Sequence, residues 1–249
     1  MIETPFKLSW IPDLPDHRDF PFEAAEPSTS AQSSVRLIWV PAALNQGSLG
    51  SCVANAIAHA VQYQRIKQRK LHAWSPSRLF LYYNARAMRG WEGFDSGAYI
   101  RDGIKSVAAQ GDVNEAEWPY DIARFTERPP DHCYDNALND QVIRYRRLSG
   151  SLDQFKACLF EDQPFVFGIS VYSNFPWSGN GEVQMPGASD SLLGGHALLC
   201  VGFDDSTRRF EFLNSWGGAW GRRGRGTIPY DYLTNPGLAA DFWQIGMVE

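Results

Sequence analysis

The sequence contains few cysteines, only four among 249 residues, at positions 52, 133, 158 and 200. Disulfide scaffolds need a denser set in a shorter chain, and common zinc sites need CxxC spacing, which this sequence lacks. We therefore expect reduced thiols, no disulfide framework and no metal site.

Long apolar runs are also missing. No segment of the sequence is long and apolar enough to cross a bilayer, and no hydrophobic stretch follows Met1 as a signal peptide would. We expect no membrane partner. A cytoplasmic location is the default expectation, and export by another route stays open.

An excess of positive charge is missing as well. The 23 Lys and Arg residues and the 28 Asp and Glu residues are intermingled and give a net charge of -5. Nucleic acid is therefore not an expected partner. The chain is instead 44% hydrophobic with nine Trp residues, which suffices for a sizeable core in one large domain or in two lobes around a cleft.

Residues 1–35 differ from the rest and are interpreted as an N-terminal arm and linker, a candidate short propeptide. WIPDLPDHRDFPF is rich in Pro and Asp, and EPSTSAQSS is polar and of low complexity, so no regular helix or strand is expected before Val35. Several apolar side chains indicate that the arm docks on the body: Phe6, Leu8, Trp10, Ile11, Phe20 and Phe22.

Residues 36–148 favour helices, and residues 149–249 favour strands. Helices are predicted over residues 52–70, 75–90 and 100–109, the second with Ser75 as its N-cap and Pro76 in its first turn. After one more helix at 151–162, strand-like segments follow at 165–172, 196–205, 208–217, 224–233 and 241–249. The predicted fold class is α+β.

The stretch QGSLGSCVANAIAHA, residues 46–60, delivers Cys52 from a Gly- and Ser-rich turn to the start of a helix. Backbone N–H groups and the helix dipole there stabilise a thiolate, which is the nucleophilic form of cysteine. Most free cysteines are simply buried hydrophobes, which suits Cys158 and Cys200, and Cys133 is expected in a loop. Of the five histidines, His196 has the most suggestive setting for a base, although a single histidine is more often structural.

Residues 214–221 read NSWGGAWG, and these residues and the cysteine stretch together match the motifs of a known family. From about Val40 to its C-terminus, the chain resembles the papain-like cysteine peptidases, as a bacterial-type member with a short N-terminal segment. His196 follows Cys52 by 144 residues, within the roughly 130 to 150 of that family, and Asn214 follows it by 162. A modest insertion accounts for the longer second spacing.

The resemblance implies a role for each of these residues. Cys52 is similar to the nucleophile, His196 to the base that takes its proton and returns it to the leaving amine, and Asn214 to the residue that orients the imidazole. Gln46 and the backbone N–H of Cys52 are similar to the oxyanion hole, where each donor contributes about 3 kcal/mol in comparable enzymes. Trp216 is similar to the tryptophan that shields the Asn–His hydrogen bond.

The family resemblance also implies the architecture and the substrate site. The fold would be a papain-like two-lobe fold with a helical left lobe, an antiparallel β-barrel-like right lobe and the active-site cleft between them. Trp220 would pack on Trp216. The residues implied to bind substrate are Ser96 and Gly97 beside the substrate backbone, and Gly168, Gly195, Ala197 and Ala239 or Ala240 around a roomy second subsite.

The sequence departs from the family pattern at three positions. Leu49 replaces the cysteine three residues before the nucleophile, which removes half of a disulfide common in secreted relatives. Val53 replaces the usual aromatic residue, and Gly195 replaces the polar residue often found before the histidine. These changes leave the implied triad complete but make the substrate specificity an open question.

The favoured function is a papain-like cysteine endopeptidase that acts through a thioester and needs no cofactor. An acyl or peptidyl transferase or an amidase with the same chemistry is the enzyme alternative, and a non-catalytic binding protein is a third interpretation. The expected partners are protein or peptide substrates and the chain's own arm. An apolar, Pro-rich arm lying in the cleft predicts partial autoinhibition.

Overall fold

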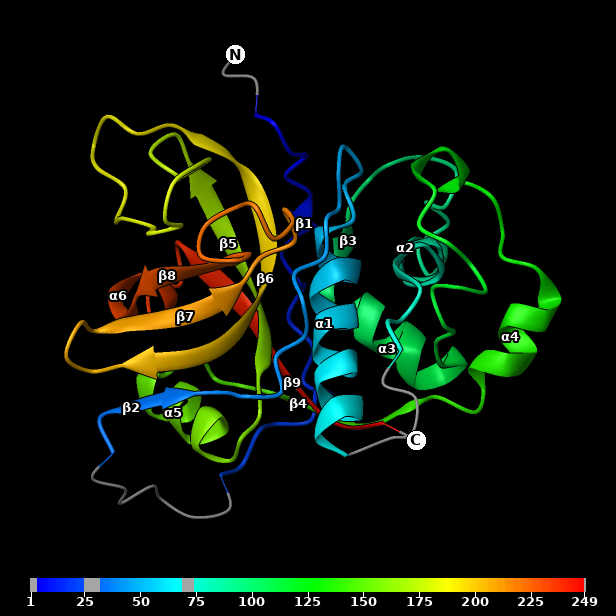
Figure 1. The fold of residues 1–249 in the computed structure, drawn as a ribbon, viewed down its shortest axis with the longest axis horizontal. Helices are drawn as coiled ribbons and strands as arrows, with labels where there is room; N and C mark the ends of the chain where they lie inside the picture. The colour runs from blue at the N-terminus through cyan, green and yellow to red at the C-terminus, as the bar shows by residue number, and fades with distance from the viewer. Residues whose placement is uncertain (1–3, 25–31, 69–73, 249) are drawn as a thin grey trace.

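The structure is a computed structural model that describes residues 4–24, 32–68 and 74–248. The long helix α1 (Cys52–Lys67) runs through the middle of the molecule, with the other helices of the first half on one side and a large sheet on the other (Figure 1). The predicted α+β class is confirmed. No helix in these described ranges is long and apolar enough to span a membrane.

The remaining helices are short. They are α2 (Arg78–Ala87), α3 (Ile100–Gln110), α4 (Asp131–Ala137), α5 (Leu152–Phe160) and α6 (Tyr230–Leu233), with a 3-10 turn at Ile122–Arg124. Helix α1 is buried on nearly every face because α2 and α3 pack on one side of it and the sheet packs on the other. It therefore forms the boundary between the two halves of the molecule.

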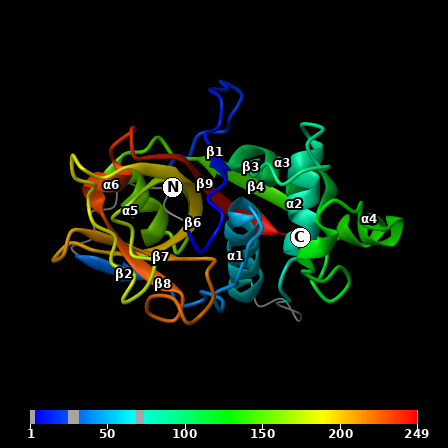
Figure 2. The same ribbon diagram turned by 90° about the horizontal axis from the view of Figure 1, so that it is seen from above.

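The large sheet has the strand order β4-β9-β5-β6-β7-β8, and β2 also pairs with β6. Its strands are β2 (Ser34–Arg36), β4 (Val142–Arg147), β5 (Phe165–Tyr172), β6 (Leu192–Asp204), β7 (Arg209–Leu213), β8 (Arg225–Pro229) and β9 (Ala239–Val248). All of these pairings are antiparallel. The sheet curves strongly (Figure 2), but the end strands β4 and β8 do not pair in the described structure, so it is an open sheet rather than a closed barrel.

Aromatic side chains fill the inside of the curved sheet. Phe155 of α5 stacks on Phe165 at a centroid distance of 5.1 Å and meets Phe242 at 4.5 Å and Phe210 at 5.6 Å. Such pairs contribute about 0.5–1.5 kcal/mol each beyond the burial of their area. This cluster fixes β5 and β9 next to each other at the edge of the site.

The N-terminal arm lies along the boundary between the helices and the sheet (Figure 2). Its strand β1 (Trp10–Ile11) pairs in parallel with β3 (Ala98–Tyr99). The expectation of no regular structure before Val35 is therefore wrong at β1, because its hydrogen-bond partners come from a segment about 88 residues away that no local pattern reveals. Most of the polar linker, at residues 25–31, falls outside the described residues.

The predicted start of the second helix is wrong by two residues. Ser77, not Ser75, is the N-cap: its Oγ accepts a hydrogen bond from the N–H of Phe80 at 3.1 Å and donates one to the carbonyl of Trp118 at 2.6 Å. Pro76 accordingly precedes the helix and forms an isolated bridge with Asn114. Both serines suit a cap, and the contact with Trp118 selects one of them.

The structure differs from the predictions in further places. Helix α4 was not predicted, and it places Cys133 in a buried helical position rather than in a loop. Strand β4 was not predicted either, and the segment 224–233 turns into helix α6 after Pro229. The first helix ends at Lys67, and the rest of its predicted extent, after residue 68, lies outside the described residues. Helix α4 and strand β4 depend on tertiary partners, since α4 lacks a side-chain cap and half of the β4 residues are arginines.

The capping contact leads to a stability prediction. We expect Ser77→Ala to lower the free energy of unfolding by about 1–3 kcal/mol, because it removes a cap and leaves a buried carbonyl unpaired. Ser75→Ala is the matched control, since the Ser75 hydroxyl makes no hydrogen bond in the described structure. Urea unfolding of the three proteins measures both effects, and equal losses in the two variants would contradict the assignment.

Candidate active site

The turn before α1 sets the position of Cys52. Gly47 adopts a φ of 59°, a conformation that suits glycine, and the N–H of Ser51 bonds to the carbonyl of Leu49 at 2.8 Å. Cys52 is then the first residue of α1 and is fully buried. As predicted from the sequence, the thiol lies at the N-terminus of a helix.

His196 and Asn214 come together on the sheet. His196 lies within β6, Asn214 follows the end of β7, and the His196 Nε2 and Asn214 Oδ1 atoms are 2.8 Å apart. The imidazole stacks on Trp216 at a centroid distance of 4.9 Å. No described residue makes a hydrogen bond to His196 Nδ1. The Cys52 thiol lies beside the backbone of Ala197, the residue after His196.

Residues 44–46 and 215–217 form a short backbone seam that joins the two halves of the site. Gln46 N donates to Ser215 O at 2.8 Å, and Gly217 N donates to Leu44 O at 2.8 Å. Asn45 and Trp216 form an antiparallel bridge between these two bonds. The seam holds the cysteine turn against the segment that carries Asn214.

The side chain of Gln46 is fully buried and fixed at both ends. Its Oε1 accepts a hydrogen bond from Ser215 Oγ at 2.7 Å, which identifies Nε2 as the outward donor. Nε2 donates to the carbonyl oxygens of Lys7 and Leu49, each at 3.1 Å. A carbonyl of the arm therefore lies at the amide that the family resemblance assigns to the oxyanion hole.

The arm covers the thiol directly. Ser9 Oγ donates to the carbonyl of Gly50 at 2.7 Å and lies 3.6 Å from Cys52 Sγ. On the other side of the arm, a Cβ at Gly97 would come within 1.9 Å of the Ser9 carbonyl oxygen, so glycine is required for this approach. Ser96 turns its hydroxyl to the carbonyl of Gly97 at 2.9 Å, and no described contact joins it to the arm.

The predicted second subsite holds the indole of Trp10. A Cβ at Gly168 would come within 2.0 Å of this ring, and one at Gly195 within 2.4 Å of the Trp10 carbonyl oxygen. Ala197 and Ala240 are both register partners of Gly168, on β6 and β9. These predicted residues are thus gathered in the structure, and the arm's own side chain fills the space beside the glycines.

Aromatic rings flank the imidazole. Trp216 stacks on Phe6 of the arm at 4.5 Å and on Trp177 at 5.3 Å, and it meets Trp220 edge to face at 5.5 Å. Trp220 is held by a hydrogen bond from its Nε1 to Pro176 O at 2.9 Å. Trp216 therefore packs on the imidazole, and Phe6 of the arm packs on Trp216.

Burial under the arm alters the protonation of both reactive groups. It raises the pKa of Cys52, although the Ser9 hydroxyl acts in the opposite direction. Burial also lowers the pKa of His196 to about 4, against the effect of the Asn214 hydrogen bond. Near neutral pH the covered site therefore favours a neutral thiol and a neutral imidazole. The expected thiolate at the helix N-terminus is not favoured while the arm excludes water.

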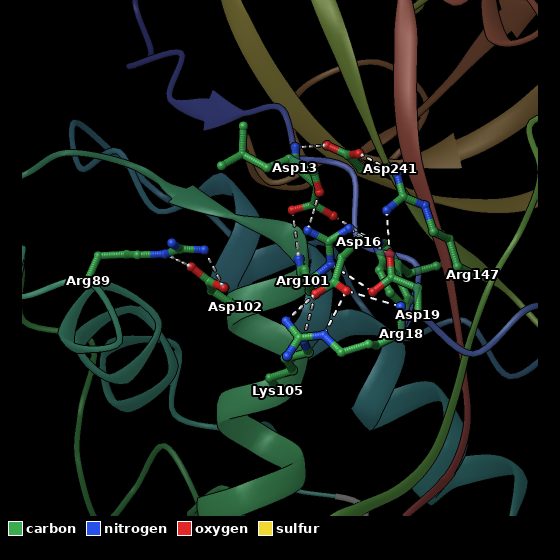
Figure 3. A network of polar contacts seen from close by, with 12 residues as sticks. Asp13, Asp16, Arg18, Asp19, Arg89, Arg101, Asp102, Lys105, Arg147 and Asp241 are labelled. Carbon is green, nitrogen blue, oxygen red and sulfur yellow. Dashed lines mark hydrogen bonds and ion pairs between the residues drawn. The ribbon is translucent and has the colours of Figure 1, made fainter.

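A polar network fastens the arm beyond Trp10 (Figure 3). Asp241 Oδ2 accepts hydrogen bonds from Trp10 Nε1 at 3.2 Å and from the N–H of Asp13 at 2.7 Å. Its other oxygen lies 3.2 Å from an Arg147 nitrogen. Asp241 thus binds both the subsite ring and the backbone of the arm.

Asp13 and Asp19 bind the body at two more points of this network. Asp13 accepts hydrogen bonds from Arg101 N at 3.1 Å and from Trp243 Nε1 at 3.0 Å. Asp19 bridges two cations, with Arg101 and Arg147 nitrogens each 2.6 Å from its Oδ2. The pKa of Asp19 is lowered: burial opposes this, but the hydrogen bonds from the two arginines outweigh it.

Sequence reasoning missed Ser9, Ser215 and Asp241 as residues of the site. Only Ser215 carried a signal, its position in the NSWG motif beside Asn214. The others act through partners distant in the chain. Across the described ranges, no group of three or more His, Cys, Asp or Glu side chains is arranged to hold a metal ion. All four cysteines lie in these ranges and are free and buried.

A family model for the papain family cysteine proteases matches residues 29–237. The chain belongs to the papain family of cysteine proteases. Among solved structures, this papain-family chain is similar to xylellain, a cysteine protease from Xylella fastidiosa, at 40% identity and a TM-score of 0.91. That match covers 99% of this chain and 98% of the other.

Two further relatives extend the comparison of this papain-family chain. An uncharacterized peptidase C1-like protein of Acanthamoeba polyphaga mimivirus is 38% identical over 224 residues, 84% of this chain and 72% of that protein. A digestive procathepsin L 3 of Tenebrio molitor larval midgut, at 21% identity and a TM-score of 0.70 over 92% of this chain and 75% of the other, shows the fold alone. The family and its relatives indicate a cysteine peptidase, and the predicted family and papain-like fold are confirmed.

We expect the arm to dock more weakly as the pH rises. Burial, followed by the charge of Asp241, raises the pKa of Asp13 to about 7 in the docked arm, from the ordinary 3.8. Docking therefore takes up a proton. The resulting stabilisation is complete below the ordinary pKa and is lost as the pH rises through about 7. Hydrogen-exchange protection of residues 8–13, corrected for intrinsic rates, should fall between pH ~5 and ~8 by at most about tenfold per unit.

Asp13→Asn is the informative variant, because burial raises the pKa of both Asp13 and Asp241 and the variant removes one of these two carboxyls, so it should reduce this dependence. The pKa of Asp19 is lowered, so Asp19 does not contribute to the pH dependence in this range. Leu14→Ala, an exposed position in the same arm, is the control that should keep the wild-type slope. An unchanged slope in Asp13→Asn would contradict the assignment.

Proposed function

We propose that the chain is an endopeptidase that hydrolyses peptide bonds through Cys52, His196 and Asn214. The observation that carries this proposal is the 2.8 Å contact between His196 Nε2 and Asn214 Oδ1, which leaves Nδ1 free of other hydrogen bonds in the described structure. The Cys52 thiol lies at a helix N-terminus beside the backbone that follows His196. This arrangement suits proton transfer from a thiol to an oriented imidazole.

In the proposed reaction, His196 Nδ1 takes the proton of Cys52 as Sγ attacks the peptide carbonyl carbon. The carbonyl oxygen gains negative charge and is stabilised by Gln46 Nε2 and the backbone N–H of Cys52. The C–N bond then breaks, the amine leaves with the proton from His196, and a thioester remains. Water, deprotonated by His196, hydrolyses the thioester and restores the thiol.

Two features support Gln46 as the oxyanion donor. Ser215 Oγ holds the amide oxygen at 2.7 Å, so the NH₂ group keeps one orientation without reorganising during the reaction. The same Nε2 already donates to a carbonyl of the arm, that of Lys7. A carbonyl group can therefore enter this position with its oxygen toward the amide.

We further propose that the arm inhibits the peptidase by occupying its cleft. Ser9 covers the thiol, Trp10 fills the space beside Gly168, and the Lys7 carbonyl takes the Gln46 amide. A substrate needs all three positions. Activity would then require the arm to leave the cleft, by displacement or by removal.

The thiol gives the first test of this function. Full-length protein should be labelled at Cys52 by an irreversible thiol-directed peptidase inhibitor and should cleave members of a peptide library. Cys52→Ala should lose at least about 10⁴-fold in kcat/KM, because the covalent step needs the thiolate. Cys158→Ala, which removes another buried thiol, is the matched control and should be labelled like the wild type.

The outcomes of this test separate the alternative functions. Absence of labelling in full-length protein and in an arm-weakened variant would favour the non-catalytic binding protein. Labelling with transfer of the acyl group to an added amine, and little hydrolysis, would favour the acyl or peptidyl transferase. Cleavage confined to side-chain or terminal amides would favour the amidase.

The arm gives the second test. We expect Trp10→Ala in the full chain to raise kcat/KM by about tenfold or more, since it removes a ring that is 7% exposed and fills the subsite. Leu14→Ala, whose side chain is 62% exposed in the same arm, should behave like the wild type. Equal kcat/KM in wild type and Trp10→Ala would contradict inhibition by the arm.

A further inference from the structure

Ser51, the N-cap residue of α1, does not cap its own helix with its side chain. A serine in this position ordinarily accepts a hydrogen bond from a backbone N–H of the first turn, which stabilises the helix by about 1 kcal/mol. The Ser51 hydroxyl makes no such bond in the described structure. It lies instead beside the hydroxyl of Tyr120 and accepts a hydrogen bond from Asn55 Nδ2 at 3.0 Å. The hydroxyl thus belongs to a polar network next to the cysteine turn, residues 46–51.

Tyr120 connects the two ends of this turn. Its hydroxyl donates to the carbonyl of Gln46 at 2.9 Å, so its oxygen accepts the hydrogen bond from the Ser51 hydroxyl. Burial raises the pKa of Tyr120, which keeps the phenol protonated and able to donate. Each hydroxyl therefore donates in one direction, Ser51 to Tyr120 and Tyr120 to Gln46.

Asn55 fixes the peptide unit between Ser51 and Cys52. The Ser51 carbonyl accepts hydrogen bonds from the backbone N–H of Asn55 at 3.0 Å and from Asn55 Nδ2 at 2.9 Å. Because a peptide unit is planar, a fixed carbonyl also fixes the direction of the N–H group in the same unit. That N–H group belongs to Cys52 and is the second proposed oxyanion donor.

Arg78 anchors this network. Its Nη1 donates to Asn55 Oδ1 at 3.2 Å and to the Asn45 carbonyl at 2.8 Å. Its Nε and Nη2 atoms each lie 2.7 Å from an oxygen of Glu115, and its guanidinium carbon lies 3.7 Å from the ring centroid of Tyr120. Since arginine only donates, the amide oxygen of Asn55 faces Arg78, and its NH₂ group faces the cysteine turn.

We propose that Tyr120 is a positioning residue that holds both proposed oxyanion donors in place. It binds the backbone of Gln46 directly, and it holds the peptide unit of Cys52 through Ser51. Donors that are fixed before the reaction need no reorganisation when the carbonyl oxygen becomes charged, so their alignment affects the rate of the chemical step more than the binding of substrate. The inference rests on the peptidase function proposed above.

The test compares peptide cleavage with alkylation of Cys52 by iodoacetamide. In the alkylation Sγ displaces iodide, so the reaction needs the thiolate but no oxyanion donor. The full chain carrying Trp10→Ala is the parent, and it is compared with Trp10→Ala/Tyr120→Phe, which loses the hydroxyl but keeps the aromatic ring. Trp10→Ala/Tyr134→Phe is the matched control, since it removes a hydroxyl of α4 that donates to Asn84 at 3.0 Å.

We expect Tyr120→Phe to lower kcat by about tenfold and to change KM by less than about twofold. The rate constant of alkylation at Cys52 should stay within about twofold of the parent, with an unchanged pH profile. The Tyr134→Phe control should match the parent in both reactions. The ratio of kcat/KM to the alkylation rate constant is the decisive quantity, because a change in folded fraction or in arm docking affects both reactions. The same ratio in all three proteins would overturn the role of Tyr120.

A spectroscopic measurement separates this inference from the peptidase proposal. The NMR signals of the Cys52 backbone amide and of the Gln46 side-chain amide report the environment of the two donors without catalysis. Both signals should move in Trp10→Ala/Tyr120→Phe relative to the parent, and neither should move in the Tyr134→Phe control. If no variant cleaves the peptide, the peptidase proposal fails, yet this pattern of shifts would still support the positioning role of Tyr120. An unchanged signal of either donor in Tyr120→Phe would overturn it.

Discussion

The backbone seam between residues 44–46 and 215–217 is the interaction on which the rest of the site depends. It pairs two segments about 170 residues apart by two backbone hydrogen bonds of 2.8 Å and an antiparallel bridge. Gln46 on one side precedes the cysteine helix, and Asn214 on the other side holds the imidazole. Ser215 also fixes the Gln46 amide, and its neighbour Asn214 contacts the imidazole, so one segment positions both the proposed oxyanion donor and the histidine. A slip of one residue would misplace both.

The sequence was sufficient to predict which residues form the site, but not the environment that sets their protonation. Cys52, His196 and Asn214 could be predicted as a triad because each stands in a short motif, and the spacing between the motifs limits the choice. The protonation of the thiol could not be predicted, since it depends on how much water reaches it. A helix N-terminus alone favours a thiolate, but Cys52 is fully buried in the structure, with Ser9 of the arm 3.6 Å from its thiol, and burial raises its pKa. The motif alone does not encode this burial.

Local patterns predicted the longer elements. The apolar spacing of four residues predicted helix α1, and runs of aromatic and β-branched residues predicted strands β5 and β6. Strand β1 has only two residues and owes its hydrogen bonds to β3, while β4 takes its place from pairing with β9. The choice between Ser75 and Ser77 likewise depended on the Trp118 carbonyl, which local propensity does not encode. Short elements defined by distant partners are thus the ones that single-sequence reasoning missed.

The docked arm and a bound peptide substrate would both need the space beside the cleft glycines. Gly97 and Gly168 leave no room for a side chain where the arm backbone and the Trp10 ring lie, and the same gaps would admit a peptide. The contacts at the two ends of the arm, at Asp13 and at Lys7, depend on different conditions, however. Asp13 takes up a proton when it docks, so its end weakens as the pH rises through about 7. At the other end, Lys7 Nζ lies 2.7 Å from Asp95 Oδ2 and the Lys7 carbonyl accepts a hydrogen bond from Gln46. Rising pH should therefore loosen the arm at Asp13, whereas release of Lys7 requires a group that competes for Gln46 and Asp95.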